Sequence, residues 1–159
     1  MLFPLLSVAQ TDYSSDVKSV DATIAALYEV ISGEAGTPRD WDRFRNLFTA
    51  DAQLIPTSKN KEGKFTYRVL SPDDYVQMFT SRVATGFYES ELHRTADDFG
   101  TIVQVFSTYE TKEKKDGPPT NRGINSIQLF YDGTRYYVMN IFWCAESLGF
   151  KLPEKYTSK

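Results

Sequence analysis

The sequence has few of the residues that build metal centres and disulfides. Its 159 residues include one cysteine, Cys144, and one histidine, His93. One cysteine cannot form an intrachain disulfide, and one histidine cannot provide a His-rich metal site within a single chain. Cys144 lies in a β-rich run, where a lone thiol usually packs as a small apolar side chain. We therefore expect neither a metal nor a cofactor.

The chain also lacks a block of basic residues. Lysine and arginine together number 18 against 21 aspartates and glutamates, which gives a net charge of -3. No DNA- or RNA-binding motif is present, so we expect no nucleic-acid partner. The P-loop, GxGxxG, GxSxG and HExxH motifs are absent as well. No apolar run is long enough to predict a membrane span.

The first ten residues, MLFPLLSVAQ, are apolar. They end in Ser7-Val8-Ala9, with small residues at both positions that a signal peptidase reads, and they resemble the end of a secretory signal peptide. No lysine or arginine precedes the apolar run, so we expect a truncated or atypical signal at residues 1–10. The mature protein would begin near Gln10 and be secreted or periplasmic. The alternative is an N-terminal tail on a cytoplasmic protein.

Aromatic residues, by contrast, are plentiful. They make up 14% of the chain, with 10 Tyr, 11 Phe and 2 Trp. Aromatic side chains favour strands and line ligand pockets. A chain of this length is expected to form one domain. We place that domain at residues 20–147, after a flexible lead-in at 11–19 and before a C-terminal tail at 148–159.

Three segments show the apolar spacing of amphipathic helices. The first runs from Val20 to a stop at Gly33, and the second runs from Asp40 to about Asp51. The third begins at Ser71, a favourable N-cap residue that is followed by proline. The predicted buried stripes are Val20, Ile24, Leu27, Val30 and Ile31; Trp41, Phe44, Leu47 and Phe48; and Tyr75, Met78 and Phe79.

Strands occupy most of the remaining sequence. We expect short strands at Ala52–Ile55, ended by Pro56, and at Thr66–Leu70. Longer strands are expected at residues 86–94 and 101–112 and in a hairpin over residues 122–146. Because the helices are segregated from a mostly antiparallel sheet, the predicted fold class is α+β.

The final hairpin turns at Asp132-Gly133, a strong hairpin signal between two β-rich runs. With a three-residue loop and Gly133 left-handed, the face that carries Asn125, Ile127 and Leu129 continues as Tyr137, Met139, Ile141 and Trp143. A two-residue loop would join it to Tyr136, Val138, Asn140 and Phe142 instead. We favour the first, because its apolar face is more continuous. Asn125 on that face either ties strands together or points at a ligand.

Three stretches carry a family resemblance. They are WDRFRNLFTADA from Trp41 to Ala52, the third helix from Ser71 to Phe79, and the hairpin from Ile124 to Trp143. Together they resemble the nuclear transport factor 2-like superfamily, which includes ketosteroid isomerase and polyketide cyclases, and RGINSIQL resembles its exported bacterial members. The resemblance covers about residues 20–146. It implies a cone: three helices packed on a strongly curved, mostly antiparallel sheet, with a pocket.

The resemblance also implies positions for a catalytic site. Ketosteroid isomerase uses a tyrosine on the first helix, an acid on a late strand and an aspartate base after the second helix. Tyr28 matches the tyrosine, and Asn125, which can still donate a hydrogen bond, matches the late-strand acid. The base position falls near Ile55-Pro56, where there is no carboxylate, so catalysis stays open. His93 is the substitute base that we consider, and a sheet-pairing role is its alternative.

Three functions follow from these observations. The first is a pocket for a small, mostly apolar molecule with a carbonyl or hydroxyl group. The second is an isomerase, dehydratase or cyclase in which Tyr28 and Asn125 polarise a carbonyl. The third is a dimeric association module without a ligand, which would form through the outer sheet face with Phe130, Tyr136 and Phe142 exposed. The predicted ligand-binding residues are Tyr28, Ile55, Tyr75, Phe79, Asn125, Met139 and Trp143.

Overall fold

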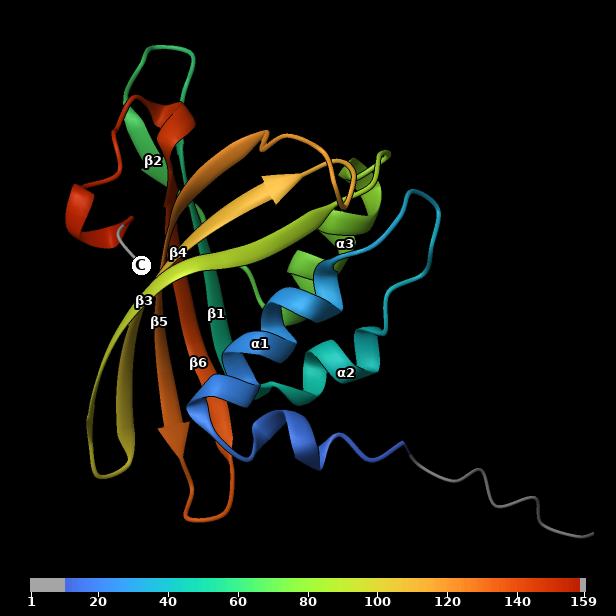
Figure 1. Ribbon diagram of the computed structural model, residues 1–159, viewed down its shortest axis with the longest axis vertical. Helices are drawn as coiled ribbons and strands as arrows, with labels where there is room; N and C mark the ends of the chain where they lie inside the picture. The colour runs from blue at the N-terminus through green and yellow to red at the C-terminus, as the bar shows by residue number, and fades with distance from the viewer. Residues whose placement is uncertain (1–10, 158–159) are drawn as a thin grey trace, which may run out of the picture.

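Three α-helices pack on one side of a six-stranded sheet in the computed structural model, which describes residues 11–157 (Figure 1). The predicted signal peptide lies outside these residues, so secretion stays a prediction. No helix in the described part is long and apolar enough to cross a membrane. The helices are α1 (Val20–Ile31), α2 (Trp41–Asn46) and α3 (Pro72–Arg82), with short 3-10 turns η1 (Ser14–Val17), η2 (Glu146–Leu148) and η3 (Glu154–Tyr156).

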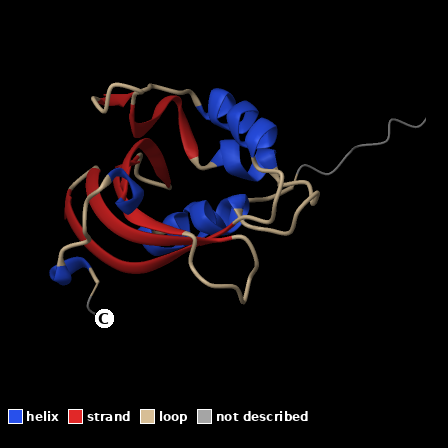
Figure 2. Ribbon diagram, turned by 90° about the horizontal axis from the view of Figure 1, so that it is seen from above, coloured by secondary structure: helices blue, strands red, loops and turns tan. Residues whose placement is uncertain are grey.

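The sheet has the strand order β2-β1-β6-β5-β4-β3. Among the described strands, β1 and β6 pair in parallel and all other neighbours are antiparallel. Seen from above, the sheet bends around the helices (Figure 2). The predicted α+β class with a curved, mostly antiparallel sheet is therefore confirmed. The strands are β1 (Phe48–Lys59), β2 (Phe65–Tyr67), β3 (Tyr88–Phe99), β4 (Ile102–Lys112), β5 (Asn121–Tyr131) and β6 (Tyr136–Ala145).

The second helix is shorter than predicted. It ends at Asn46, and the chain enters β1 at Phe48 instead of continuing to about Asp51. The backbone N–H of Val138 in β6 donates to the carbonyl of Leu47 at 2.8 Å. Backbone groups that would bond within a longer helix therefore bond to the sheet instead. Phe48 is buried as a strand residue.

Pro56 does not end the first strand. β1 runs on to Lys59, and Thr57, the residue after Pro56, pairs with Tyr67 of β2. Proline has no N–H to donate, but its carbonyl still accepts a hydrogen bond from the backbone of Arg68 at 3.2 Å. The predicted strand at residues 52–55 was too short because proline removes only one donor from the ladder.

The last hairpin has a four-residue turn, not the three-residue turn that we favoured. Tyr131 pairs with Tyr136 across it. The Oδ1 atom of Asp132 accepts a hydrogen bond from the N–H of Arg135 at 2.8 Å and closes the turn. Gly133 has φ 100°, the positive value expected of it. Next to the turn, the two strands therefore pair as in the alternative, in which Tyr136 and Val138 lie on the same face as Leu129.

A β-bulge in β6 restores the pairing that we favoured in the part of the hairpin farther from the turn. Leu129 pairs with Val138 on the turn side of the bulge, whereas Ile127 pairs with Ile141 beyond it. The extra residue is Met139, and its side chain is 43% exposed. Placing Met139 on the concave face was therefore wrong, because the inserted residue reverses the alternation of the strand.

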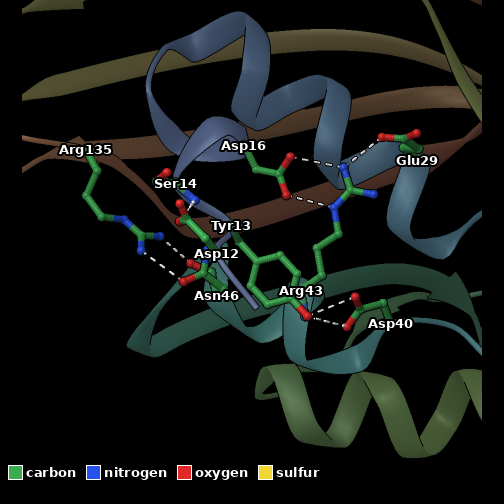
Figure 3. Close-up of polar contacts among 9 residues, drawn as sticks. All are labelled: Asp12, Tyr13, Ser14, Asp16, Glu29, Asp40, Arg43, Asn46 and Arg135. Atoms are coloured by element: carbon green, nitrogen blue, oxygen red, sulfur yellow. Dashed lines mark hydrogen bonds and ion pairs between the residues drawn. The ribbon is translucent and has the colours of Figure 1, made fainter. Parts of the chain in front are cut away.

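The segment that we predicted as a flexible lead-in is held against the helices (Figure 3). It contains η1, and Val17 at the end of that turn is 2% exposed. Asp16 forms an ion pair with Arg43 of α2 at 2.7 Å. The hydroxyl of Tyr13 donates to the carboxylate of Asp40 at 2.9 Å. This part of the chain belongs to the packed domain.

The C-terminal tail covers part of the outer face of the sheet. The ring of Tyr156 in η3 packs on that of Phe106 in β4, with centroids 5.1 Å apart. The hydroxyl of Thr108 donates to the backbone carbonyl of Tyr156 at 2.8 Å. One end of the outer face is thus occupied by the chain itself.

Candidate functional site

A cavity of about 310 Å³ lies between α1, α3 and the concave face of the sheet. Its wall is mostly apolar and rich in aromatic rings. Few polar side chains reach it, and they come from α1, α3 and strands β3 to β5. Cavities of this size and composition suit small organic molecules. The aromatic lining residues are Tyr28, Phe44, Tyr75, Phe79, Phe87, Tyr109 and Trp143.

The N-caps of α1 and α3 determine which of their residues face the cavity. Ser19 caps α1 by accepting a hydrogen bond from the N–H of Ala22 at 3.1 Å. Ser71 and Asp74 form a capping box at the start of α3, as the sequence indicated for Ser71. With these starts, the apolar stripes of both helices face the sheet and meet across the cavity.

Five of the predicted ligand-binding residues line the cavity, and two do not. Met139 lies on the bulge of β6, outside the cavity. Ile55 is also excluded, because side chains alternate along β1 and Leu54 takes the inward position. The five lining residues are Tyr28, Tyr75, Phe79, Asn125 and Trp143. Their role in binding remains a proposal.

His93 lies on the other face of the sheet. A bulge in β3 leaves Leu92 unpaired, so the alternation shifts between Glu91 and His93. His93 is the register partner of Thr108, whose side chain bonds to Tyr156 on the outer face. His93 therefore cannot serve as a base in this cavity, and its assignment as the substitute base was wrong.

Tyr28 and Asn125 meet at one side of the cavity. The Nδ2 atom of Asn125 donates to the hydroxyl of Tyr28 at 3.0 Å, and that hydroxyl lies 2.7 Å from Oγ of Ser107. All three side chains are buried. Burial raises the pKa of Tyr28, and the nearby negative charge of Glu89 raises it further. Tyr28 is therefore a neutral phenol at physiological pH.

Glu89 supplies a carboxyl group that the sequence analysis did not assign to the site. It projects from β3 into the cavity, and Nδ2 of Asn125 lies 3.4 Å from its Oε1. Burial raises the pKa of Glu89 to about 7, because the ionised form loses its hydration, while the Asn125 contact lowers it. Within residues 11–157, no ion pair includes Glu89. The cavity thus contains a carboxyl group that can change protonation near neutrality.

Two further phenols share the cavity with Glu89. Burial raises the pKa of Tyr75 and of Tyr109, and the charge of Glu89 adds to both shifts. Neither hydroxyl has a hydrogen-bond partner among the residues that the structure describes. Tyr109 was not among the predicted site residues. Both hydroxyls are therefore available to a bound molecule.

The comparisons agree with this geometry at the level of the fold. No protein-family model matches the sequence, and no curated protein does either. Solved structures do match: an NTF-2-like protein from Silicibacter pomeroyi has a TM-score of 0.52 and 12% identity, over 79% of this chain and 92% of that one. The chain has a nuclear transport factor 2-like fold.

Two other structures with this likeness are more similar in shape. A protein with a cystatin-like fold from Nostoc punctiforme has a TM-score of 0.60 and 11% identity, over 79% of this chain and 87% of that one. A candidate calcium/calmodulin-dependent protein kinase II association domain from Xanthomonas campestris has a TM-score of 0.58 and 16% identity, over 85% and 86%. At such identities the NTF2-like fold is shared, while function has to be argued from the site.

The buried carboxyl predicts a specific pH dependence of stability. The pKa of Glu89 rises from 4.5 to about 7 on folding, so the folded protein holds this proton more tightly than the unfolded chain. The free energy of unfolding should therefore fall by about 2–3 kcal/mol between pH 4.5 and 8 because of this group. Urea unfolding of the wild type and of Glu89→Gln across this range measures it. The variant should lack this decrease. If the free energy of unfolding changed with pH in parallel for both proteins, the raised pKa of Glu89 would be contradicted.

Proposed function

We propose that the protein binds a small, mostly apolar molecule that carries a carbonyl or hydroxyl group. The observation that supports this most directly is the cavity itself: an apolar, aromatic wall around Glu89, Tyr75 and Tyr109. An apolar body would displace water from the wall, and the polar groups would orient a single oxygen.

The wall is held by contacts between its own rings. Tyr75 stacks on Phe44, with centroids 5.5 Å apart, and meets Trp143 edge-on at 6.3 Å. Phe79 contacts Phe87 edge-on at 5.2 Å. Rings from α2, α3 and β6 therefore support one another, which favours a pocket that is formed before a ligand arrives.

Filling the cavity should abolish binding. Val83, at the C-terminal end of α3, lines the cavity and is half-buried, so Val83→Phe places a ring in the ligand volume. With 9-fluorenol or 9-fluorenone as probe, we expect the affinity from ligand-observed NMR to fall at least about tenfold. Val69→Phe, at an exposed position outside the cavity, is the matched control and should bind like the wild type.

Two results would contradict the proposal. Unchanged binding to Val83→Phe would place the probes elsewhere on the molecule. Absence of binding to the wild type by these probes and by a wider set of bicyclic and tricyclic ketones and alcohols would leave the cavity without a ligand role.

Catalysis is the second candidate, and the protonation of Glu89 favours it. The isomerase, dehydratase or cyclase classes all require removal of a proton next to a carbonyl or hydroxyl. An ionised Glu89 would take an α-hydrogen of a ketone and become a carboxylic acid. The resulting enolate oxygen would accept hydrogen bonds from Tyr75 and Tyr109. This assigns the base to β3, away from the position near Ile55-Pro56.

Hydrogen–deuterium exchange tests this step without knowledge of the natural substrate. In D₂O, the protein should accelerate exchange of the α-hydrogens of 2-tetralone, with a rate that increases through about pH 7. Glu89→Gln should lower that rate by about 10²-fold or more. Glu110→Gln, a partly buried carboxylate paired with Lys112 outside the cavity, is the control. Exchange equal to that in buffer alone would leave only the binding role.

We also propose a homodimer that forms through the outer sheet face. Phe130 and Phe142 are 36% and 46% exposed, and Ile102, the register partner of Phe130, is exposed beside it. Tyr136, which we had placed on this face, packs against the core instead. The four-residue turn causes this, because it pairs Tyr136 with Tyr131 and so puts Tyr136 on the concave face. The likeness to a candidate association domain is in keeping with assembly of this kind.

A single charge on that face should separate the subunits. Phe142→Lys would place a cation in the apolar patch, and sedimentation velocity should show a monomer where the wild type is a dimer. Tyr67→Lys, at an even more exposed aromatic on β2, should leave the dimer intact. A monomeric wild type at about 100 µM would exclude this interface.

A further inference from the structure

Hydrogen-bonded side chains lead from the cavity into the sheet. Asn125 donates through Nδ2 to the hydroxyl of Tyr28 at 3.0 Å. That hydroxyl lies 2.7 Å from Oγ of Ser107, and Ser107 in turn donates to Oε1 of Glu91 at 2.5 Å. The side chains come from β5, α1, β4 and β3 respectively, so the path joins four elements of the fold.

The ion pair at the far end of this path determines the direction in which each hydroxyl donates its hydrogen bond. Arg94 donates to both carboxylate oxygens of Glu91, at 2.9 Å through Nε and 2.5 Å through Nη2. An ion-paired carboxylate only accepts hydrogen bonds, so Ser107 must donate to it. A serine hydroxyl has one hydrogen, and Tyr28 must therefore donate its own hydrogen to Ser107. The hydroxyl hydrogen of Tyr28 is then unavailable to a ligand.

The same reasoning fixes the orientation of the Asn125 amide. The oxygen of Tyr28 can only accept from Asn125, so the NH₂ group faces Tyr28 and, at 3.4 Å, Glu89. The carbonyl oxygen of Asn125 is left, and no residue in the described part of the chain bonds to it. Asn125 is 6% exposed as a residue and lines the cavity, so this oxygen is an acceptor without a protein partner that a bound molecule can reach.

We propose that Asn125 accepts a hydrogen bond from the ligand, so that the cavity selects a hydroxyl-bearing molecule over the corresponding ketone. This inference rests on the proposed binding function and narrows its ligand class to alcohols, phenols or enols. A hydroxyl can donate to Asn125 and still accept from Tyr75 or Tyr109. A ketone accepts only, and it leaves the Asn125 oxygen unpaired, which a buried polar site penalises strongly.

A pair of probes with one skeleton tests the selection. We compare 9-fluorenol with 9-fluorenone at about pH 5, where Glu89 keeps its proton and is not an additional anionic acceptor. The wild type should bind the alcohol about tenfold or more tightly than the ketone by ligand-observed NMR. A ratio near one, or a preference for the ketone, would overturn the inference while leaving the binding function in place.

Ser107→Ala tests the origin of the selection. Without its acceptor, Tyr28 can turn its hydrogen to Asn125, and the amide can rotate to present NH₂ to the cavity. The preference for the alcohol should fall at least about fivefold and can reverse toward the ketone. Ser126→Ala, which removes a serine hydroxyl on β5 that bonds to Gln104 outside the cavity, should keep the wild-type ratio.

A second variant covers the case in which Ser107→Ala does not fold. Tyr28→Phe removes the acceptor that holds the amide, and it should reduce the preference in the same way. An unchanged ratio in a folded variant of either kind would overturn the inference. If neither probe binds the wild type in any condition, the binding function itself fails and this inference fails with it.

Discussion

The ion pair between Glu91 and Arg94 determines how the polar side of the cavity is arranged. Arg94 also donates to Asp21 of α1 at 2.6 Å, so the same guanidinium ties the first helix to β3. With Glu91 held as an acceptor, each hydroxyl and amide in turn has only one direction in which to donate. Asn125 is thereby oriented by a residue that never reaches the cavity. The apolar wall sets the volume of the site, whereas this ion pair sets its hydrogen-bonding character.

Two bulges decide which side chains reach the cavity. The one at Leu92 leaves Glu89 on the cavity side and turns His93 to the outer face, and the one at Met139 moves that side chain to the outer face. Each adds one residue to a strand and so reverses the alternation on which face assignments depend. Neither position carries a glycine, proline or other sequence mark of a bulge. This is why reasoning from alternation failed at both, although the strands themselves were located.

Much of the fold was predictable because local signals mark its elements. The Ser71 cap, the Asp132-Gly133 turn and the apolar spacing of the first helix each identify one element. The meeting of Tyr28 with Asn125 came from the family resemblance. Glu89 was not predicted, because the resemblance implies a base after the second helix and not on β3. One signal was available in the sequence. By alternation, Glu89 and Glu91 lie on the same face as the apolar Phe87, which indicates acids on a face that is otherwise buried.

The parallel pairing of β1 with β6 has a consequence for how the chain folds. Among the described strands, β1 and β2 join the rest of the sheet only through β6, which follows all the others along the chain. During synthesis, β1 can pair with β2 early, but it must wait for most of the chain before it acquires β6, which joins it to the rest of the sheet. A pairing between such distant segments closes a long loop and is formed slowly. Until then, the aromatic surfaces that later enclose the cavity are exposed to chaperones and to other unfinished chains.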